Sequence, residues 1–141
     1  MAGEPASSPL ADALARVGDR WTLLVVDALL SGPKRFGDLS DEISGLAPNI
    51  LTSRLRHLER EALLVARPYS ERPPRFVYEL TASGHELAGA LRLLADWGSR
   101  GSDDPEGLRH EVCGTTLEAR WYCSTCEQVV DAGDATDLHF V

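Results

Sequence analysis

The chain has 141 residues, of which 43% are hydrophobic and 26% are charged, and its formal net charge is −8. That length suits one ordinary domain with a small appendage, and the apolar fraction is sufficient for a real core. No apolar run approaches the roughly 18 residues of a membrane span, so we expect no membrane partner.

The negative charge is concentrated in the C-terminal half. Residues 34–75 carry 8 basic and 6 acidic side chains, whereas residues 76–141 carry 4 basic and 12 acidic ones. The net charge counts against a nucleic-acid binder, but the middle of the chain can still face a polyanion. The opening MAGEPASSPL lacks the features of a secretory signal, and the three cysteines are an odd number. We therefore expect a cytoplasmic protein without a disulfide framework.

Three helices are predicted in the first third of the chain. Residues 9–17 carry apolar side chains at helical spacing. Asp19 can cap a second helix over residues 21–30, which is apolar on nearly every side and should be buried. A short third helix is predicted over residues 36–43.

A longer helix is predicted to begin at Pro48, a residue that suits the first helical turn. Its apolar face holds Leu51, Leu55, Leu58 and Ala62. The opposite face carries side chains that can bond base edges and phosphates, namely Asn49, Thr52, Ser53, Arg56 and Arg60. Any amphipathic helix places polar residues outside, but this one follows a short helix in a helix-turn-helix pattern.

A β-hairpin is predicted next, with strands over residues 64–69 and 76–80. Its tip, residues 70–75, is stiffened by proline and carries Arg72 and Arg75. A basic tip that follows a helix-turn-helix is typical of a DNA-binding wing.

The expected DNA contacts fall into three groups. Major-groove contacts are assigned to Asn49, Thr52, Ser53 and Arg56, phosphate contacts to Lys34, Arg35 and Arg60, and wing contacts to Arg72 and Arg75.

Thr81 can cap a last helix. One face of this helix holds Leu87, Leu91, Leu94 and Trp97. That face can pack on the core of the chain or on a second subunit, and the sequence favours neither.

A polar linker, residues 99–107, separates a domain over residues 8–98 from a segment over 108–141. The segment holds every cysteine, in the spacing His110-x2-Cys113-x9-Cys123-x2-Cys126. Three thiolates and one imidazole suit tetrahedral zinc, so we expect one zinc ion per chain in a ribbon-like module. Residues 116–122 are expected to form a strand of the hairpin that joins the two pairs, and Gly114 permits the turn.

Other readings of the cysteine cluster are free thiols or an iron–sulfur cluster, and His139 can replace His110 as a ligand. Four protein ligands leave no open position for water, so the zinc is expected to be structural. Neither a nucleophile–base pairing nor a phosphate-binding loop is visible, so we do not expect an enzyme.

The strings GDRWTLLVVDALLSGPKRFGDL, LTSRLRHLERE, ERPPRFVYELTASGHEL and LLADWG resemble the HxlR family of bacterial transcription regulators, relatives of the MarR group. The resemblance covers about residues 9–98 and implies a winged helix-turn-helix fold, mainly α with a small β-hairpin wing. It also implies a homodimer formed by the first and last helices, with recognition helices in adjacent major grooves of double-stranded DNA.

Two departures from the family pattern matter. Several members of the family are similar in carrying a redox-sensing cysteine just before the first helix. This chain has Ser8 and Pro9 at that place. The recognition helix often opens with serine and lysine, where this chain has Ala47 and Asn49. The first departure removes that route of thiol sensing, and the second removes one contact to DNA.

These observations predict a sequence-specific DNA-binding transcription regulator with a structural zinc ribbon. A repressor is the expected kind, although the sequence itself does not distinguish a repressor from an activator. Two alternatives remain. One is a protein–protein adaptor that uses the ribbon without binding DNA, and the other is a regulator that senses metal or oxidants through the cysteines. A small-molecule effector is a further partner that the sequence does not identify.

Overall fold

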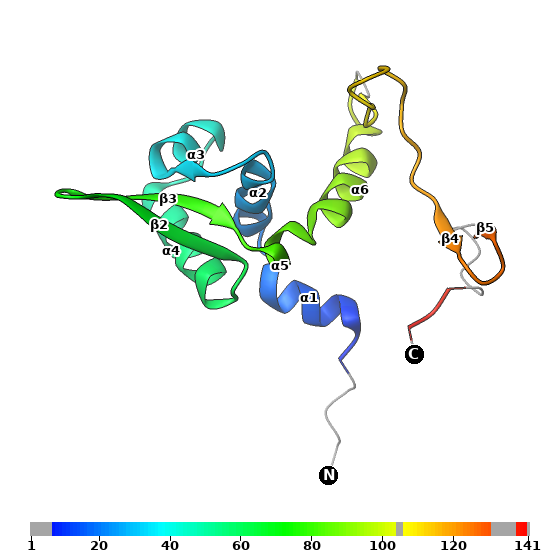
Figure 1. The fold of residues 1–141 in the computed structure, drawn as a ribbon, viewed down its shortest axis with the longest axis horizontal. Helices are drawn as coiled ribbons and strands as arrows, with labels where there is room; N and C mark the ends of the chain where they lie inside the picture. Colours follow the sequence, from blue (N-terminus) through cyan, green and yellow to red (C-terminus); the bar gives the residue numbers. More distant parts are fainter. Residues whose placement is uncertain (1–6, 104–105, 131–137, 141) are drawn as a thin grey trace, which may run out of the picture. The chain divides into compact units, whose positions relative to one another are not determined.

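The structure is a computed structural model that describes residues 7–103, 106–130 and 138–140. The elements in chain order are α1 (Pro9–Val17), α2 (Arg20–Leu29), β1 (Lys34–Arg35), α3 (Phe36–Glu42), α4 (Pro48–Arg60), β2 (Leu64–Glu71), β3 (Pro74–Leu80), α5 (Ala82–His85), α6 (Ala88–Ser99), β4 (Trp121–Cys123) and β5 (Gln128–Val130) (Figure 1). The chain divides into two compact units, Met1–Leu91 and Arg92–Val141. The division falls inside α6, before the boundary that the sequence places at residue 98.

The first two helices confirm the sequence prediction. Helix α1 has the predicted bounds, and Ser8 caps it by accepting the backbone N–H of Ala11 at 3.1 Å. Helix α2 begins one residue earlier than predicted because Asp19 acts as its N-cap. The Asp19 carboxylate accepts the backbone N–H groups of Trp21 and Thr22 at 3.0 and 3.1 Å, which satisfies two of the donors that a helix start leaves free.

The sheet of the first unit has the strand order β1-β3-β2 and is antiparallel. Strands β2 and β3 form the predicted wing hairpin, but they extend to Glu71 and Pro74, so the tip is only Arg72-Pro73. The sequence did not predict β1, which adds a short third strand through the pairs Lys34↔Tyr78 and Arg35↔Val77.

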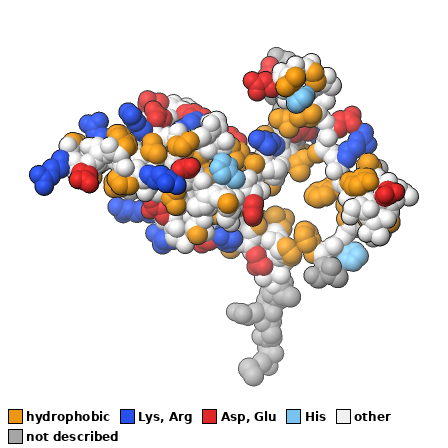
Figure 2. Space-filling view, in the orientation of Figure 1, with side chains coloured by type: hydrophobic (Ala, Val, Ile, Leu, Met, Phe, Trp, Pro, Cys, Tyr) orange, Lys and Arg blue, Asp and Glu red, His pale blue; other side chains and the backbone are white. Residues whose placement is uncertain are grey.

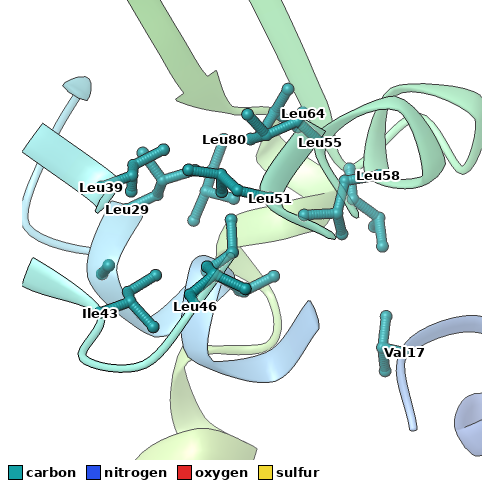
Figure 3. Packing of buried hydrophobic residues seen from close by; sticks show 14 of the residues in the cluster. Val17, Leu29, Leu39, Ile43, Leu46, Leu51, Leu55, Leu58, Leu64 and Leu80 are labelled. Atoms are coloured by element: carbon teal, nitrogen blue, oxygen red, sulfur yellow. The ribbon is translucent and has the colours of Figure 1, made fainter. Parts of the chain in front are cut away.

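The core of the first unit lies where α2, α3 and α4 meet the base of the wing (Figure 3). The predicted apolar face of α4 is buried, since Leu51, Leu55 and Leu58 are each 2% exposed or less. Leu64 and Leu80 pair across the base of the wing and join the same cluster. The packing fixes the orientation of α4, so the opposite face of the helix must point to solvent.

Ala62 is an exception to the predicted apolar face. Helix α4 ends at Arg60, and Ala62 is exposed in the left-handed region, with a φ of 57°. The backbone N–H of Leu63 donates to Leu58 O at 3.0 Å across this turn. The helix therefore ends in a left-handed turn that normally carries glycine.

We expect Ala62→Gly to raise the free energy of unfolding by about 0.5–1 kcal/mol, because glycine adopts a positive φ without the steric cost that alanine has there. This gain exceeds the cost of the larger conformational entropy of glycine in the unfolded chain. Urea denaturation at a fixed protein concentration measures the change. Ala13→Gly, inside α1, is the matched control and should lower stability by about 1 kcal/mol. A lower stability for Ala62→Gly would contradict this account of the turn.

The sequence predicted one helix after Thr81, but the structure has two, α5 and α6. The Thr81 hydroxyl caps α5 as predicted, accepting the backbone N–H of Gly84 at 3.1 Å. Glycines at 84 and 89 have low helix propensity and weaken a continuous helix. Of the predicted apolar face, Leu91 is buried in the core, whereas Leu94 and Trp97 are exposed.

Candidate nucleic-acid interface and cysteine turns

Helix α4 presents the predicted polar face to solvent. Asn49, Ser53, Arg56 and Arg60 are exposed, and their spacing places them along one side of the helix. Thr52 lies beside them but is half-buried, and its hydroxyl donates to Pro48 O at 3.0 Å. Four of the five predicted α4 residues are therefore free to reach a partner, and Thr52 is partly engaged with its own helix.

Four arginines of this region are exposed: Arg56 and Arg60 on α4, and Arg72 and Arg75 at the wing. Within the part of the chain that the structure describes, none of them forms an ion pair. Figure 2 shows Lys and Arg side chains gathered around the wing end of the first unit. Exposed arginines without an acidic partner attract phosphate groups.

Lys34 and Arg35 differ in whether their positive charge is already paired with an acidic side chain. The Lys34 ammonium pairs with the Glu42 carboxylate, and its side chain is only 18% exposed. The Arg35 guanidinium lies 4.7 Å from the centre of the Tyr69 ring, a cation–π contact that holds it beside β2. Arg35 therefore remains available for a phosphate, whereas Lys34 is already neutralised.

Two further arginines have structural contacts that the sequence analysis missed. The Nε of Arg54 lies 3.0 Å from Asp19 Oδ1, an ion pair that ties α4 to the start of α2, although the direction of the N–H does not meet hydrogen-bond geometry. Arg67 pairs with Glu79 across the wing at 2.8 Å. Both pairs depend on tertiary packing, so no local sequence pattern reveals them.

A hollow of about 330 Å³ lies between part of α4 and the wing sheet, with Thr52 and Arg56 on one side and Phe76 and Tyr78 on the other. Burial raises the pKa of the Tyr78 hydroxyl above its usual value. Phe76 and Tyr78 therefore line the same hollow as Arg56, and no sequence pattern indicated a place for either aromatic residue.

The second unit places the first predicted ligand pair in one turn. His110 Nδ1 lies 3.3 Å from Cys113 Sγ, and Gly114 has a φ of 70°, which confirms the turn expected there. Arg109 and Thr116 bridge the two sides of this turn. Hydrogen bonds from the Thr115 side chain and backbone lower the pKa of the Cys113 thiol.

The second pair lies in another turn, between β4 and β5. Backbone N–H groups of Cys126 and Thr125 donate to Cys123 and lower the pKa of its thiol, whereas Cys123 raises the pKa of Cys126. The three thiols are free, and Cys113 and Cys126 are exposed. Each turn therefore presents one sulfur that is stabilised as a thiolate by backbone or side-chain donors.

The expected hairpin between the two pairs is not formed. Residues 117–120 have no strand partner among the described residues, and β4 begins only at Trp121. Over the ranges 7–103, 106–130 and 138–140, no three His, Cys, Asp or Glu side chains converge on one point. The structure thus brings His110 to Cys113 and Cys123 to Cys126, but it does not join the pairs, and His139 joins neither.

Within its described part, the chain has no helix long and apolar enough to cross a membrane.

Comparisons with known proteins agree with the helix-turn-helix and wing described above. The profile of the HxlR-like helix-turn-helix family matches residues 16–105. An uncharacterised HTH-type transcriptional regulator of Mycobacterium tuberculosis, Rv3095, is 38% identical over 128 residues, which cover 88% of this chain and 80% of that protein. The reduced form of the transcriptional regulator YodB from B. subtilis superimposes with a TM-score of 0.57 at 27% identity, covering 68% of this chain and 95% of that one.

A further similarity extends into the C-terminal unit. The crystal structure of PA1607, which carries a provisional description as a transcription factor, covers 92% of this chain and 93% of its own length, with a TM-score of 0.75 and 30% identity. The family and these relatives are transcription regulators, not enzymes. The chain therefore belongs to the HxlR-like helix-turn-helix family.

Proposed function

We propose that this protein is a sequence-specific DNA-binding transcription regulator that acts as a homodimer and represses transcription by occupying its site. The observation that carries the proposal is the exposed face of α4, where Asn49, Ser53 and Arg56 stand opposite the buried leucines. A helix of this kind fits the major groove, and side chains near its N-terminus reach base edges. Arg60, Arg72, Arg75 and Arg35 would contact the phosphates on either side.

Arg56→Ala is expected to weaken binding to the specific site by about 1–3 kcal/mol, because arginine donates two hydrogen bonds to guanine in the major groove. Binding to random DNA should change little. Fluorescence anisotropy with both DNAs, at one salt concentration, measures the difference.

The control for this prediction is Arg92→Ala, which removes the same charge from an exposed position in the other unit and should leave both affinities nearly unchanged. Equal losses on specific and random DNA for Arg56→Ala would contradict base recognition and make Arg56 a phosphate contact.

We also propose that His110, Cys113, Cys123 and Cys126 hold one structural zinc ion per chain. Two features support this assignment. Each pair is formed in a tight turn, and Cys113 and Cys123 accept hydrogen bonds that favour the thiolate, the form that binds zinc. Closing the two turns on one ion would complete a tetrahedral site and supply folding energy to this segment. The position of His110 beside Cys113 favours it over His139 as the fourth ligand.

A second candidate function is a redox-responsive regulator. Exposed Cys113 and Cys126 thiols favour it, because solvent-accessible sulfur reacts with oxidants. The relative YodB has been solved in a reduced form, and HypR, which is named a redox regulator, in both reduced and oxidised forms. If oxidation releases zinc and DNA together, the cysteine turns are sensory. If DNA affinity is unchanged after oxidation, they are structural.

A further inference from the structure

Arg35 is held by an aromatic ring and not by an acidic side chain. In the part of the chain that the structure describes, its guanidinium forms no ion pair. The carboxylate of Asp38, three residues away, accepts the backbone N–H of Arg35 at 3.0 Å instead. An exposed arginine must give up rotamer freedom when it binds a phosphate, so an orientation that is already fixed in the free protein favours binding.

The ring that holds Arg35 belongs to Tyr69, the extra residue of a β-bulge in the wing. The ladder between β2 and β3 shifts its register between Pro68 and Ser70, which leaves Tyr69 without a partner on β3. A bulge of this kind redirects the side chain of its extra residue. The Tyr69 ring is 45% exposed, and its centre lies 4.7 Å from the guanidinium carbon of Arg35. At that distance the negative face of the ring attracts the cation.

The contact crosses the sheet, because Arg35 lies on β1, Tyr69 lies on β2, and β3 runs between these two strands. Arg35 pairs with Val77 of β3, whereas the next residue of β3, Tyr78, lines the hollow beside α4. Successive residues of a strand face opposite sides of a sheet, and paired residues share a side. Arg35 and the Tyr69 ring therefore lie on the side of the sheet that faces away from this hollow.

A ring differs from a carboxylate in what it leaves of the arginine charge. Arg67 also pairs with Val77, but its guanidinium forms an ion pair with the Glu79 carboxylate at 2.8 Å. That carboxylate cancels the charge of Arg67 for any approaching phosphate. An aromatic face carries no net charge, so the ring of Tyr69 orients Arg35 and leaves its positive charge available.

We propose that Tyr69 is a positioning residue for DNA binding, whose ring holds the Arg35 guanidinium in place for a backbone phosphate. The inference rests on the proposed DNA-binding function and deepens it. Arg35 lies outside α4, and it faces away from the hollow that Arg56 lines. Its contact is therefore with the phosphate backbone and carries no sequence information. It follows that Tyr69 contributes equally to the affinity for specific and for random DNA.

The test is a double-mutant cycle on the full chain. Fluorescence anisotropy at one low salt concentration measures the affinity for DNA from upstream of the protein's own gene and for random DNA. Tyr69→Leu should weaken binding to both DNAs by about two- to fivefold for each bound copy, as expected for an exposed cation–π contact. In the Arg35→Ala background the same change should have no effect, because the charge that the ring holds is gone. Tyr69→Phe keeps the ring and should bind like the wild type.

The matched control is Phe76→Leu. It removes a ring of similar exposure, 40%, that lines the hollow on the other side of the sheet. Any effect of this change should be the same with and without Arg35. Circular dichroism verifies that the Tyr69 and Phe76 variants are folded, as expected for side chains that are exposed.

The outcomes separate the positioning role from the proposed function. If the wild type binds DNA but Tyr69→Leu binds equally well, or weakens binding as much without Arg35, the positioning role is overturned and the DNA-binding regulator stands. A loss confined to the specific DNA would also overturn it, as would a Tyr69→Phe variant as weak as Tyr69→Leu. A wild-type chain that binds neither DNA at low salt would overturn the proposed function and the positioning role together.

Discussion

Purified Cys123→Ser protein is expected to contain almost no zinc, whereas the wild-type chain should carry the one ion proposed above. A structural zinc site contributes about 10–16 kcal/mol of apparent binding free energy at neutral pH, and it needs all its deprotonated ligands. Serine offers a hard, protonated oxygen in place of a thiolate, so the remaining three ligands hold the ion poorly. Elemental analysis of the protein, purified without added metal, measures the stoichiometry.

Loss of the ion should also loosen the second unit, because no described residue there is buried. Limited proteolysis should therefore cut residues 106–130 faster in Cys123→Ser, while the first unit resists as before. Ser124→Ala, in the same turn, is the matched control and should keep its zinc. A wild-type chain without zinc, or a Cys123→Ser chain that keeps it, would contradict the proposed site.

The second large effect concerns the buried face of α4. Leu51→Ala is expected to lower the free energy of unfolding of the first unit by about 2–5 kcal/mol, because truncation of a fully buried leucine loses transfer free energy and leaves a cavity. Leu51 is completely buried in the cluster where α2 and α4 meet. A domain is stable by only about 5–15 kcal/mol, so this loss removes a large part of the total.

Urea denaturation followed by circular dichroism measures this change, with the protein concentration fixed because the proposed dimerisation would contribute to apparent stability. Val65→Ala is the control, since Val65 on β2 is 37% exposed, and it should cost less than about 1 kcal/mol. A loss for Leu51→Ala no larger than that of the control would contradict the packing of α4 against the core.

Most of the first unit was predictable because its signals are local. The leucine spacing of α4 identified the buried face, and Asp19 and Thr81 marked two helix starts through their capping side chains. Strand β1 was missed because two residues carry no pattern, and only the pairing with β3 creates it. The ion pair of Arg54 with Asp19 was missed for the same reason, since its partners meet only after the helices pack.

The cysteine segment was less predictable. The spacing His110-x2-Cys113 and Cys123-x2-Cys126 correctly indicated two tight turns, because each turn is set by neighbouring residues. The spacing did not determine the path of residues 117–120. Their alternating apolar side chains are typical of a strand, but these residues pair with no other strand in the described chain. Where the two turns lie relative to each other is likewise not set by the local pattern.

The most direct test of DNA recognition is the affinity of the wild-type protein for DNA from upstream of its own gene, titrated with salt before and after chelation. If Arg35, Arg60, Arg72 and Arg75 of both copies each neutralise a phosphate, affinity should fall about 10³- to 10⁵-fold between 50 and 200 mM salt. Binding that survives chelation would make the cysteine unit separable from DNA recognition. The absence of binding at low salt would contradict the regulator and favour a protein–protein adaptor.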